Sequence, residues 1–203
     1  MINSSFYNKK EISNLNLKKV GKDCVISKLA RFYTKNVIIG NRCRIDDDVV
    51  FKGKIILGDN VHLARGCTLS GGNKGIELKS FAAISNFVQF FASSDDYLNP
   101  YIPAATLNEN LKSKFSKIYE SKIIIGKSVL IGSMSCVLPG TVMMDFSSAG
   151  AFSLIYGKIS KGTFVQSFKN DNIQKKRNFK EMSKKFDNIN KILNNNDKVY
   201  KNN

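Results

Sequence analysis

The sequence predicts an all-β solenoid of short parallel strands, and two periodic features support this prediction. Aliphatic or aromatic residues return at every sixth position over long stretches of the chain. A small or β-branched residue most often stands four places after each of them, and Gly, Ser, Ala or Asp often follows directly. A period of six fits neither an α-helix nor a two-residue strand alternation. It fits a solenoid in which three short strands, about 18 residues, make one coil that rises by about 4.8 Å.

The periodic apolar residues are expected to fill the interior of this solenoid. They are Val20, Ile26, Phe32, Ile39, Ile45, Phe51, Leu57, Leu63, Leu69, Leu78, Ile84 and Phe90 in a first block, and Ile125, Ile131, Val137, Met143, Ala149 and Ile155 in a second. Cys24, Cys43 and Cys67 stand at small inward positions between them. We therefore expect these three cysteines to be core residues and not nucleophiles.

Three other segments lie outside the repeat. Residues 1–19 are expected to form a cap with a short helix, begun by Ser4 or Ser5, over the first coil. The solenoid should occupy residues 20–165, interrupted at 92–122 by a long extruded loop that reaches a neighbouring subunit. The tail, residues 166–203, is expected to be a basic helix. Its apolar residues recur at steps of three and four, namely Phe179, Met182, Phe186, Ile189 and Leu193.

Composition narrows the classes of function. The chain has 203 residues, a formal net charge of +16 and a sequence pI of about 9.7. The charge favours a polyanionic partner such as a phosphorylated cofactor, or reflects a bias towards Lys. No recognised nucleic-acid motif accompanies it, so nucleic acid is not expected as a partner. Peripheral contact of the basic tail with the inner face of the membrane is an open alternative to packing against the solenoid.

Targeting and metal-binding signals are not found in the sequence. It has no apolar run long enough to span a membrane and no signal peptide, so we expect a cytoplasmic protein. The four cysteines have no CxxC spacing and there is a single histidine, so no metal site is expected.

The repeat resembles that of the hexapeptide-repeat acyltransferases. The segments "SFYNKKEISNL", "KGKIILGDNVHLARGCTLSGG", "FVQFFASSDDY" and "IGKSVLIGSMSCVLPGT" are similar to sugar acetyltransferases of the galactoside and maltose type, in a surface-polysaccharide branch with the "SSDDY" form. This resemblance implies a left-handed parallel β-helix and a homotrimer with active sites between subunits. It also implies acetyl-CoA as co-substrate.

The function implied by this resemblance is an acetyl-CoA-dependent O-acetyltransferase. Its acceptor would be a sugar hydroxyl in surface-polysaccharide biosynthesis (lipopolysaccharide, O-antigen or capsule), attacking the thioester directly with a histidine as general base. Two alternatives stay open: N-acetylation of an amino nucleotide-sugar, and a non-catalytic trimeric scaffold.

His62 is the only imidazole in the chain and is the expected general base. It precedes the inward Leu63 and should therefore point outward. By resemblance, Asp95 stands where galactoside-type members have their catalytic histidine. We expect a shared site in which His62 of one subunit meets Asp95 or Asp96 of the next, with one aspartate orienting the imidazole. The alternative is that the two aspartates only form a turn.

The remaining candidate residues are assigned to the acceptor and to the cofactor. Contacts with the acceptor sugar are expected from Asp46, Ser85, Asn86 and Tyr97, with a solvated acidic corner as the alternative for Asp46. By resemblance, CoA contacts are expected from Ser133, Ala151, Lys158 and Lys169, the first two to the pantetheine arm and Lys169 to phosphate.

Overall fold

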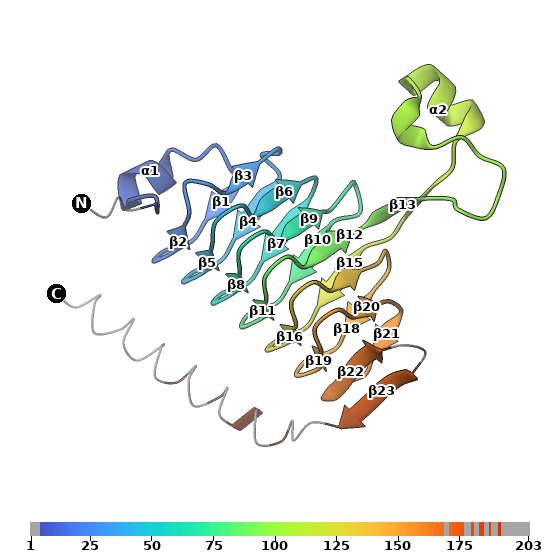
Figure 1. Ribbon diagram of the computed structural model, residues 1–203. Helices are drawn as coiled ribbons and strands as arrows, with labels where there is room; N and C mark the ends of the chain where they lie inside the picture. Colours follow the sequence, from blue (N-terminus) through green and yellow to red (C-terminus); the bar gives the residue numbers. More distant parts are fainter. Residues whose placement is uncertain are drawn as a thin grey trace.

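The protein is a stack of short coils, seen from the side in Figure 1. The computed structural model describes residues 5–168, the backbone of residues 171–176, and five single positions beyond them, Lys180, Ser183, Lys184, Asp187 and Lys191. Three sheets of parallel strands run along the stack, and each of the first six coils contributes one strand to each sheet. This confirms the predicted parallel solenoid.

We name the three sheets in the order in which the chain visits them. The first sheet contains β1 (Lys19–Val20), β4 (Val37–Ile39), β7 (Ile55–Leu57), β10 (Ile76–Leu78), β15 (Ile123–Ile125), β18 (Val142–Met143) and β21 (Lys158–Ile159). The second contains β2 (Val25–Ile26), β5 (Arg44–Ile45), β8 (His62–Leu63), β11 (Ala83–Ile84), β16 (Leu130–Ile131), β19 (Ser148–Ala149), β22 (Thr163–Phe168) and β23 (Asp171–Lys176). The third contains β3 (Arg31–Phe32), β6 (Val50–Lys52), β9 (Thr68–Ser70), β12 (Gln89–Phe91), β17 (Cys136–Val137) and β20 (Leu154–Ile155).

The interior of the stack follows the six-residue period. Every predicted inward position from Ile39 to Ile155 is buried, while Val20 and Phe32 in the first coil are half-buried against the same core. The small inward residues of the later coils are hydroxyl-bearing, and each hydroxyl donates to a carbonyl three residues earlier at 2.7 Å, as seen for Ser135, Thr141, Ser147 and Ser153. These bonds satisfy the polar groups, so a serine or threonine can replace an apolar residue in the core.

A column of glycines lets the first coils approach closely. A Cβ added at Gly21 would lie 2.5 Å from the backbone of Gly40, and one added at Gly40 would lie 2.5 Å from the backbone of Gly58. These distances are far below a van der Waals contact between carbon atoms of about 3.5 Å. The backbone hydrogen bonds that join consecutive coils at this corner, such as Gly40 N–H to Leu57 O at 2.9 Å, therefore depend on the absence of a side chain.

The N-terminal helix α1 (Lys9–Ser13) begins later than the sequence suggested. Its N-cap is Asn8, whose side chain accepts from the Glu11 N–H at 2.9 Å, while the Glu11 carboxylate accepts from the Asn8 N–H at 2.8 Å. This reciprocal capping box satisfies two backbone donors at once. The expectation of a cap at Ser4 or Ser5 was wrong because Asn8 and Glu11 supply the complete motif.

The interruption at residues 92–122 projects from the stack, and we call it the arm. Its base is a pair of antiparallel strands, β13 (Ser93–Asp95) and β14 (Ile118–Glu120). Between them lie the 3-10 turn η1 (Ala104–Thr106) and the helix α2 (Glu109–Phe115). Figure 1 shows β13, α2 and the connecting chain standing clear of the coils. The arm is thus a folded extension, where the sequence had predicted only an extruded loop.

The end of the chain differs from the predicted helical tail. Residues 163–168 and 171–176 form the antiparallel pair β22 and β23, which closes the second sheet. The five described positions from Lys180 to Lys191 are helical. The five apolar residues on which the tail helix was predicted lie outside the described residues. Within the part of the chain that the structure describes, no helix combines the length and apolar character needed to cross a membrane.

Candidate active site

A groove of about 380 Å³ lies over the second sheet and gathers five of the predicted site residues. They are Asp46, His62, Ser85, Asn86 and Ser133. The groove is completed by Ala64, Ala83, Ile84 and Leu130.

The stacking of the coils explains why residues far apart in sequence meet in this groove. In the second sheet, His62 pairs in register with Arg44 on one side and with Ala83 on the other, and Ala83 pairs with Leu130. Since Leu63 is buried in the core, the alternation of a strand turns His62 outward, as predicted. Four consecutive coils therefore line one surface.

His62 is held by a carboxylate of its own chain. Its Nε2 lies 2.9 Å from Asp46 Oδ2, and the other carboxylate oxygen, Oδ1, accepts a hydrogen bond from Arg44 Nε at 2.7 Å. The imidazole is partly exposed, at 42% of its side-chain surface, whereas that of Asp46 is 19% exposed. A chain of two hydrogen bonds therefore links Arg44, Asp46 and His62.

The charge of Asp46 determines which imidazole nitrogen can take up a proton. Burial alone would raise the pKa of Asp46, but hydrogen bonds from Arg44 and His62 together lower it below its ordinary value. The carboxylate is therefore ionised at neutral pH and can only accept hydrogen bonds. His62 Nε2 must then carry the hydrogen, so the neutral ring keeps its lone pair on Nδ1.

This pairing corrects one sequence-based expectation. Asp95 or Asp96 of a neighbouring subunit was expected to orient the imidazole, but Asp46 occupies Nε2 from within the same chain. The signal was present in the sequence, because Asp46 directly follows Ile45, whose register partner is Leu63 beside His62. Sequence reasoning also missed Arg44, which fixes the second oxygen of Asp46.

Asp95 and Tyr97 line a different cavity at the base of the arm. This hollow of about 720 Å³ is bounded by Phe91, Ser93, Ser94, Ala104, Ala105, Lys112, Ile118, Cys136, Leu138 and Pro139 in addition to these two. It shares no residue with the His62 groove. Asp95 Oδ1 accepts a hydrogen bond from the Ala104 N–H at 3.1 Å, which fastens η1 to β13. Within one chain, His62 and Asp95 thus belong to separate surfaces, as predicted.

The Asp96 carboxylate forms hydrogen bonds within the arm. Its Oδ1 accepts from the Leu98 and Asn99 N–H groups, and its Oδ2 accepts from the Asn99 side chain at 2.7 Å and the Tyr119 hydroxyl at 3.0 Å. These bonds, that of the Asn99 side chain first, lower the pKa of Asp96 to about 2. Four accepted bonds occupy a carboxylate, so the geometry favours the turn interpretation for Asp96 over a catalytic one.

The expected CoA residues are only partly brought together. Ser133 lines the His62 groove, and Ala151 is stacked on it one coil later, with the Phe152 N–H donating to the Ser133 carbonyl at 2.9 Å. Lys158 is exposed on the first sheet and so lies away from the groove. Lys169 lies outside the described residues. Among the described residues, no cluster of His, Cys, Asp or Glu could hold a metal ion.

Comparisons with known proteins agree on the class of protein. A model of the family described as bacterial transferase hexapeptide (six repeats) matches residues 36–71. The dTDP-4-amino-4,6-dideoxy-D-glucose acyltransferase of Escherichia coli is 32% identical over 149 residues, which cover 71% of this chain and 75% of that protein.

Comparison with solved structures indicates the same class of protein. AntD, an N-acyltransferase from Bacillus cereus in complex with dTDP and 3-hydroxybutyryl-CoA, superposes with a TM-score of 0.83 at 27% identity, covering 94% of this chain and 99% of AntD. A serine-to-cysteine mutant of AntD, in complex with dTDP-4-amino-4,6-dideoxyglucose and coenzyme A, superposes with a TM-score of 0.80 at 28% identity over 91% of this chain and 97% of that one.

Proposed function

Because the chain belongs to the hexapeptide-repeat acyltransferases, we propose that it transfers an acyl group from an acyl-CoA to the amino group of a nucleotide-activated amino sugar. The observation that carries this proposal is the 32% identity to an acyltransferase of dTDP-4-amino-4,6-dideoxy-D-glucose over three quarters of that protein. The match of nearly the full chain to AntD structures holding dTDP and CoA species supports it. We expect the reaction to take place in the cytoplasm.

This proposal replaces O-acetylation of a polysaccharide hydroxyl by the N-acyl alternative. The Escherichia coli relative is an acyltransferase of a 4-amino sugar, and an AntD structure holds 3-hydroxybutyryl-CoA, so the donor of this chain need not be acetyl-CoA. An amine is also the better nucleophile, and it needs a base only to remove the proton that the nitrogen sheds as the amide forms.

The residues of the groove can perform this step. The acceptor nitrogen attacks the thioester carbonyl, the carbon–sulfur bond breaks, and CoA leaves as a thiolate. His62 takes the proton from the nitrogen on Nδ1, since Asp46 holds Nε2 in the protonated form. As the imidazole becomes positively charged, the ionised Asp46 stabilises it. Ser85, Asn86 and Ser133 supply polar groups around the reacting atoms.

The acceptor assignment predicts a large difference between two sugars that differ in one group. With dTDP-4-amino-4,6-dideoxyglucose as acceptor we expect CoA release, and with the matched dTDP-sugar bearing a hydroxyl at carbon 4 we expect kcat/KM to fall at least about 100-fold. The rate with each acceptor sugar is measured by release of the CoA thiol, with acetyl-CoA and with 3-hydroxybutyryl-CoA as donors. Preference for the hydroxyl sugar would instead support O-acetylation. No turnover together with no CoA binding would support a scaffold.

We further propose that the site is completed between subunits of a homotrimer. The groove of about 380 Å³ is too small to enclose a CoA thioester together with a nucleotide sugar. The arm, in contrast, presents exposed apolar side chains, with Tyr97 87% and Leu98 95% exposed just after β13. Exposed apolar residues gathered on a projecting segment are typical of a surface covered by another chain. The hollow beside Asp95 would then face the His62 groove of the next subunit.

A shared site predicts that two inactive variants restore each other. Trimers that mix His62→Ala and Asp95→Asn subunits should regain turnover that neither variant has alone, because some sites then combine an intact His62 with an intact Asp95. Asparagine can still accept the Ala104 hydrogen bond, so the arm should stay folded. Co-purified differently tagged subunits, assayed for CoA release, measure the effect. An Asp95→Asn enzyme of full activity, or a monomer in solution, would contradict the shared site.

A further inference from the structure

Two cysteines occupy the same position in the first two coils. Cys24 precedes Val25 and Cys43 precedes Arg44, and Val25 and Arg44 are register partners in the second sheet. Neighbouring strands are about 4.8 Å apart. This spacing lies within the Cα separation of about 4.4–6.8 Å that a disulfide accepts. Both cysteines are free thiols, and each donates to a glycine carbonyl of the next coil at 3.1 Å, Cys24 to Gly40 and Cys43 to Gly58.

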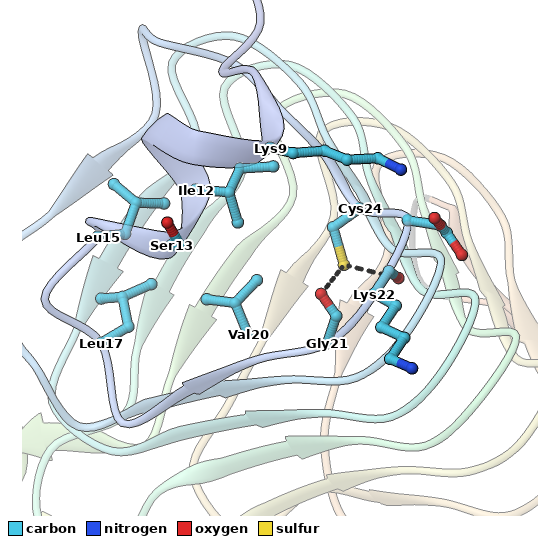
Figure 2. A pocket seen from close by; sticks show the side chains of 10 residues that line it. Lys9, Ile12, Ser13, Leu15, Leu17, Val20, Gly21, Lys22 and Cys24 are labelled. Carbon is cyan, nitrogen blue, oxygen red and sulfur yellow. Dashed lines mark hydrogen bonds between the residues drawn. The ribbon is translucent and has the colours of Figure 1, made fainter.

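The two thiols differ in access. Cys43 is buried, at 1% exposure, as expected of a core residue. Cys24 was also expected in the core, but it is only half-buried and lines a hollow of about 420 Å³ between α1 and the first coil. Figure 2 shows the Cys24 sulfur directed into this hollow, beside Val20 and Lys22. The hollow is otherwise lined by Ile12, Leu15 and Leu17, with Lys9 at its edge. A small reagent can therefore reach Cys24 but not its partner.

The thiols also differ in reactivity. The neighbouring Cys43 side chain, opposed by burial, lowers the pKa of Cys24 to about 7, while the Cys24 side chain and burial raise the pKa of Cys43. Elsewhere burial raises the pKa of Cys67 to about 11 and also raises that of Cys136. Since the thiolate is the reactive form, Cys24 is the cysteine that should react first at neutral pH.

We propose that Cys24 and Cys43 form a redox-active thiol pair that a small hydroperoxide converts to a disulfide between the first two coils. The Cys24 thiolate attacks the peroxide oxygen, the O–O bond breaks, and Cys24 becomes a sulfenic acid while an alcohol or water leaves. Cys43 then attacks the sulfenic sulfur, loses its proton, and expels the oxygen as water. An accessible cysteine of low pKa beside a buried resolving cysteine is the arrangement that this chemistry requires. The proposal is independent of the acyl-transfer reaction.

Peptide mapping of the full-length protein tests the pair directly. Trypsin separates all four cysteines, releasing Cys24 within residues 23–28 and Cys43 within residues 43–44. After treatment of the reduced protein with hydrogen peroxide and alkylation of the remaining thiols, we expect these two peptides to be joined and to lose the mass of two hydrogen atoms. A thiol reductant should separate them. In the untreated native protein, Cys24 should be alkylated at least about 10-fold faster than Cys67.

Two substitutions separate formation of the sulfenic acid from formation of the disulfide, and both introduce residues that other coils carry at the same position. Cys43→Val copies Val61 at the same position of the third coil, and Cys24→Ser copies Ser147 of a later coil. With Cys43→Val, peroxide should give a Cys24 sulfenic acid that dimedone traps and no disulfide, and it should form more slowly than in the wild type because the Cys43 side chain no longer lowers the pKa of Cys24. With Cys24→Ser, neither should form. The proposal is overturned if the wild-type protein forms no linked peptide, if Cys24 is oxidised further without linkage to Cys43, or if Cys24 and Cys67 are alkylated at the same rate.

Discussion

Replacing His62 by alanine is expected to lower kcat at least about 100-fold, with a much smaller change in KM, because the base that accepts the proton of the attacking amine is lost. CoA release under saturating acceptor and acyl-CoA measures the change. Turnover within threefold of the wild type would remove His62 from the mechanism, whatever the acceptor proves to be.

The role of Asp46 can be separated from that of His62 by the same assay and by a spectroscopic readout. Asp46→Asn should lower kcat by about 10-fold, since the ring loses the ionised acceptor that fixes its tautomer. Because His62 is the only histidine, nitrogen NMR of the untagged protein reports this ring alone. We expect the Nε2-protonated form in the wild type and a mixture in the variant.

Glu77→Gln is the matched control for this substitution. Glu77 also forms an outward ion pair, with Lys122 Nζ at 2.6 Å, but on the first sheet and away from the groove. The Glu77→Gln substitution should leave both kcat and the tautomer of His62 unchanged. Equal losses from Asp46→Asn and Glu77→Gln would mean that the effect of Asp46 is on the fold and not on the imidazole.

Gly40→Ala is expected to cause the largest loss of stability. The added Cβ would lie 2.5 Å from the backbone of Gly58, so two coils must separate. Overpacking of this kind costs about 3 kcal/mol, which for a chain of this size lowers Tm by roughly 6–12 °C. Thermal unfolding followed by circular dichroism measures the shift.

Gly157→Ala provides the comparison for Gly40→Ala. Gly157 has φ +69° and no atom near its added Cβ, so its substitution should cost only the left-handed backbone strain of about 1 kcal/mol. If the two variants unfold at the same temperature, the glycine column is not a point of close coil contact.

The sequence predicted the interior of this protein better than its surface. Each inward residue repeats the same local environment, so a period of six is enough to place Leu63 in the core and His62 outside it. Pairings between outward side chains are not given by the period. No insertion separates Ile45 from Leu63, so the count placed Asp46 and His62 on neighbouring strands, but it did not show that these two side chains bond to each other, and Asp46 was assigned to the acceptor.

The arm and the chain end were harder to predict because they do not repeat. The two aspartates of "SSDDY" could not be distinguished in the sequence. In the structure, the Asp96 carboxylate accepts four hydrogen bonds within the arm, while Asp95 lines the neighbouring hollow. Apolar residues at steps of three and four predicted a helical tail over residues 166–203, but residues 163–168 and 171–176 pair as strands. Local contacts of this kind carry no periodic signal.

The antiparallel pair β22 and β23 has a consequence for how this protein behaves at high concentration. A solenoid of parallel strands has two open ends, and each could receive a coil from another molecule and grow into a fibre. At one end, β23 runs against the direction of the coils, so an incoming parallel strand finds no matching edge on the second sheet. At the other end, α1 lies beside the first coil (Figure 1). We therefore expect that removal of either element promotes the growth of filaments.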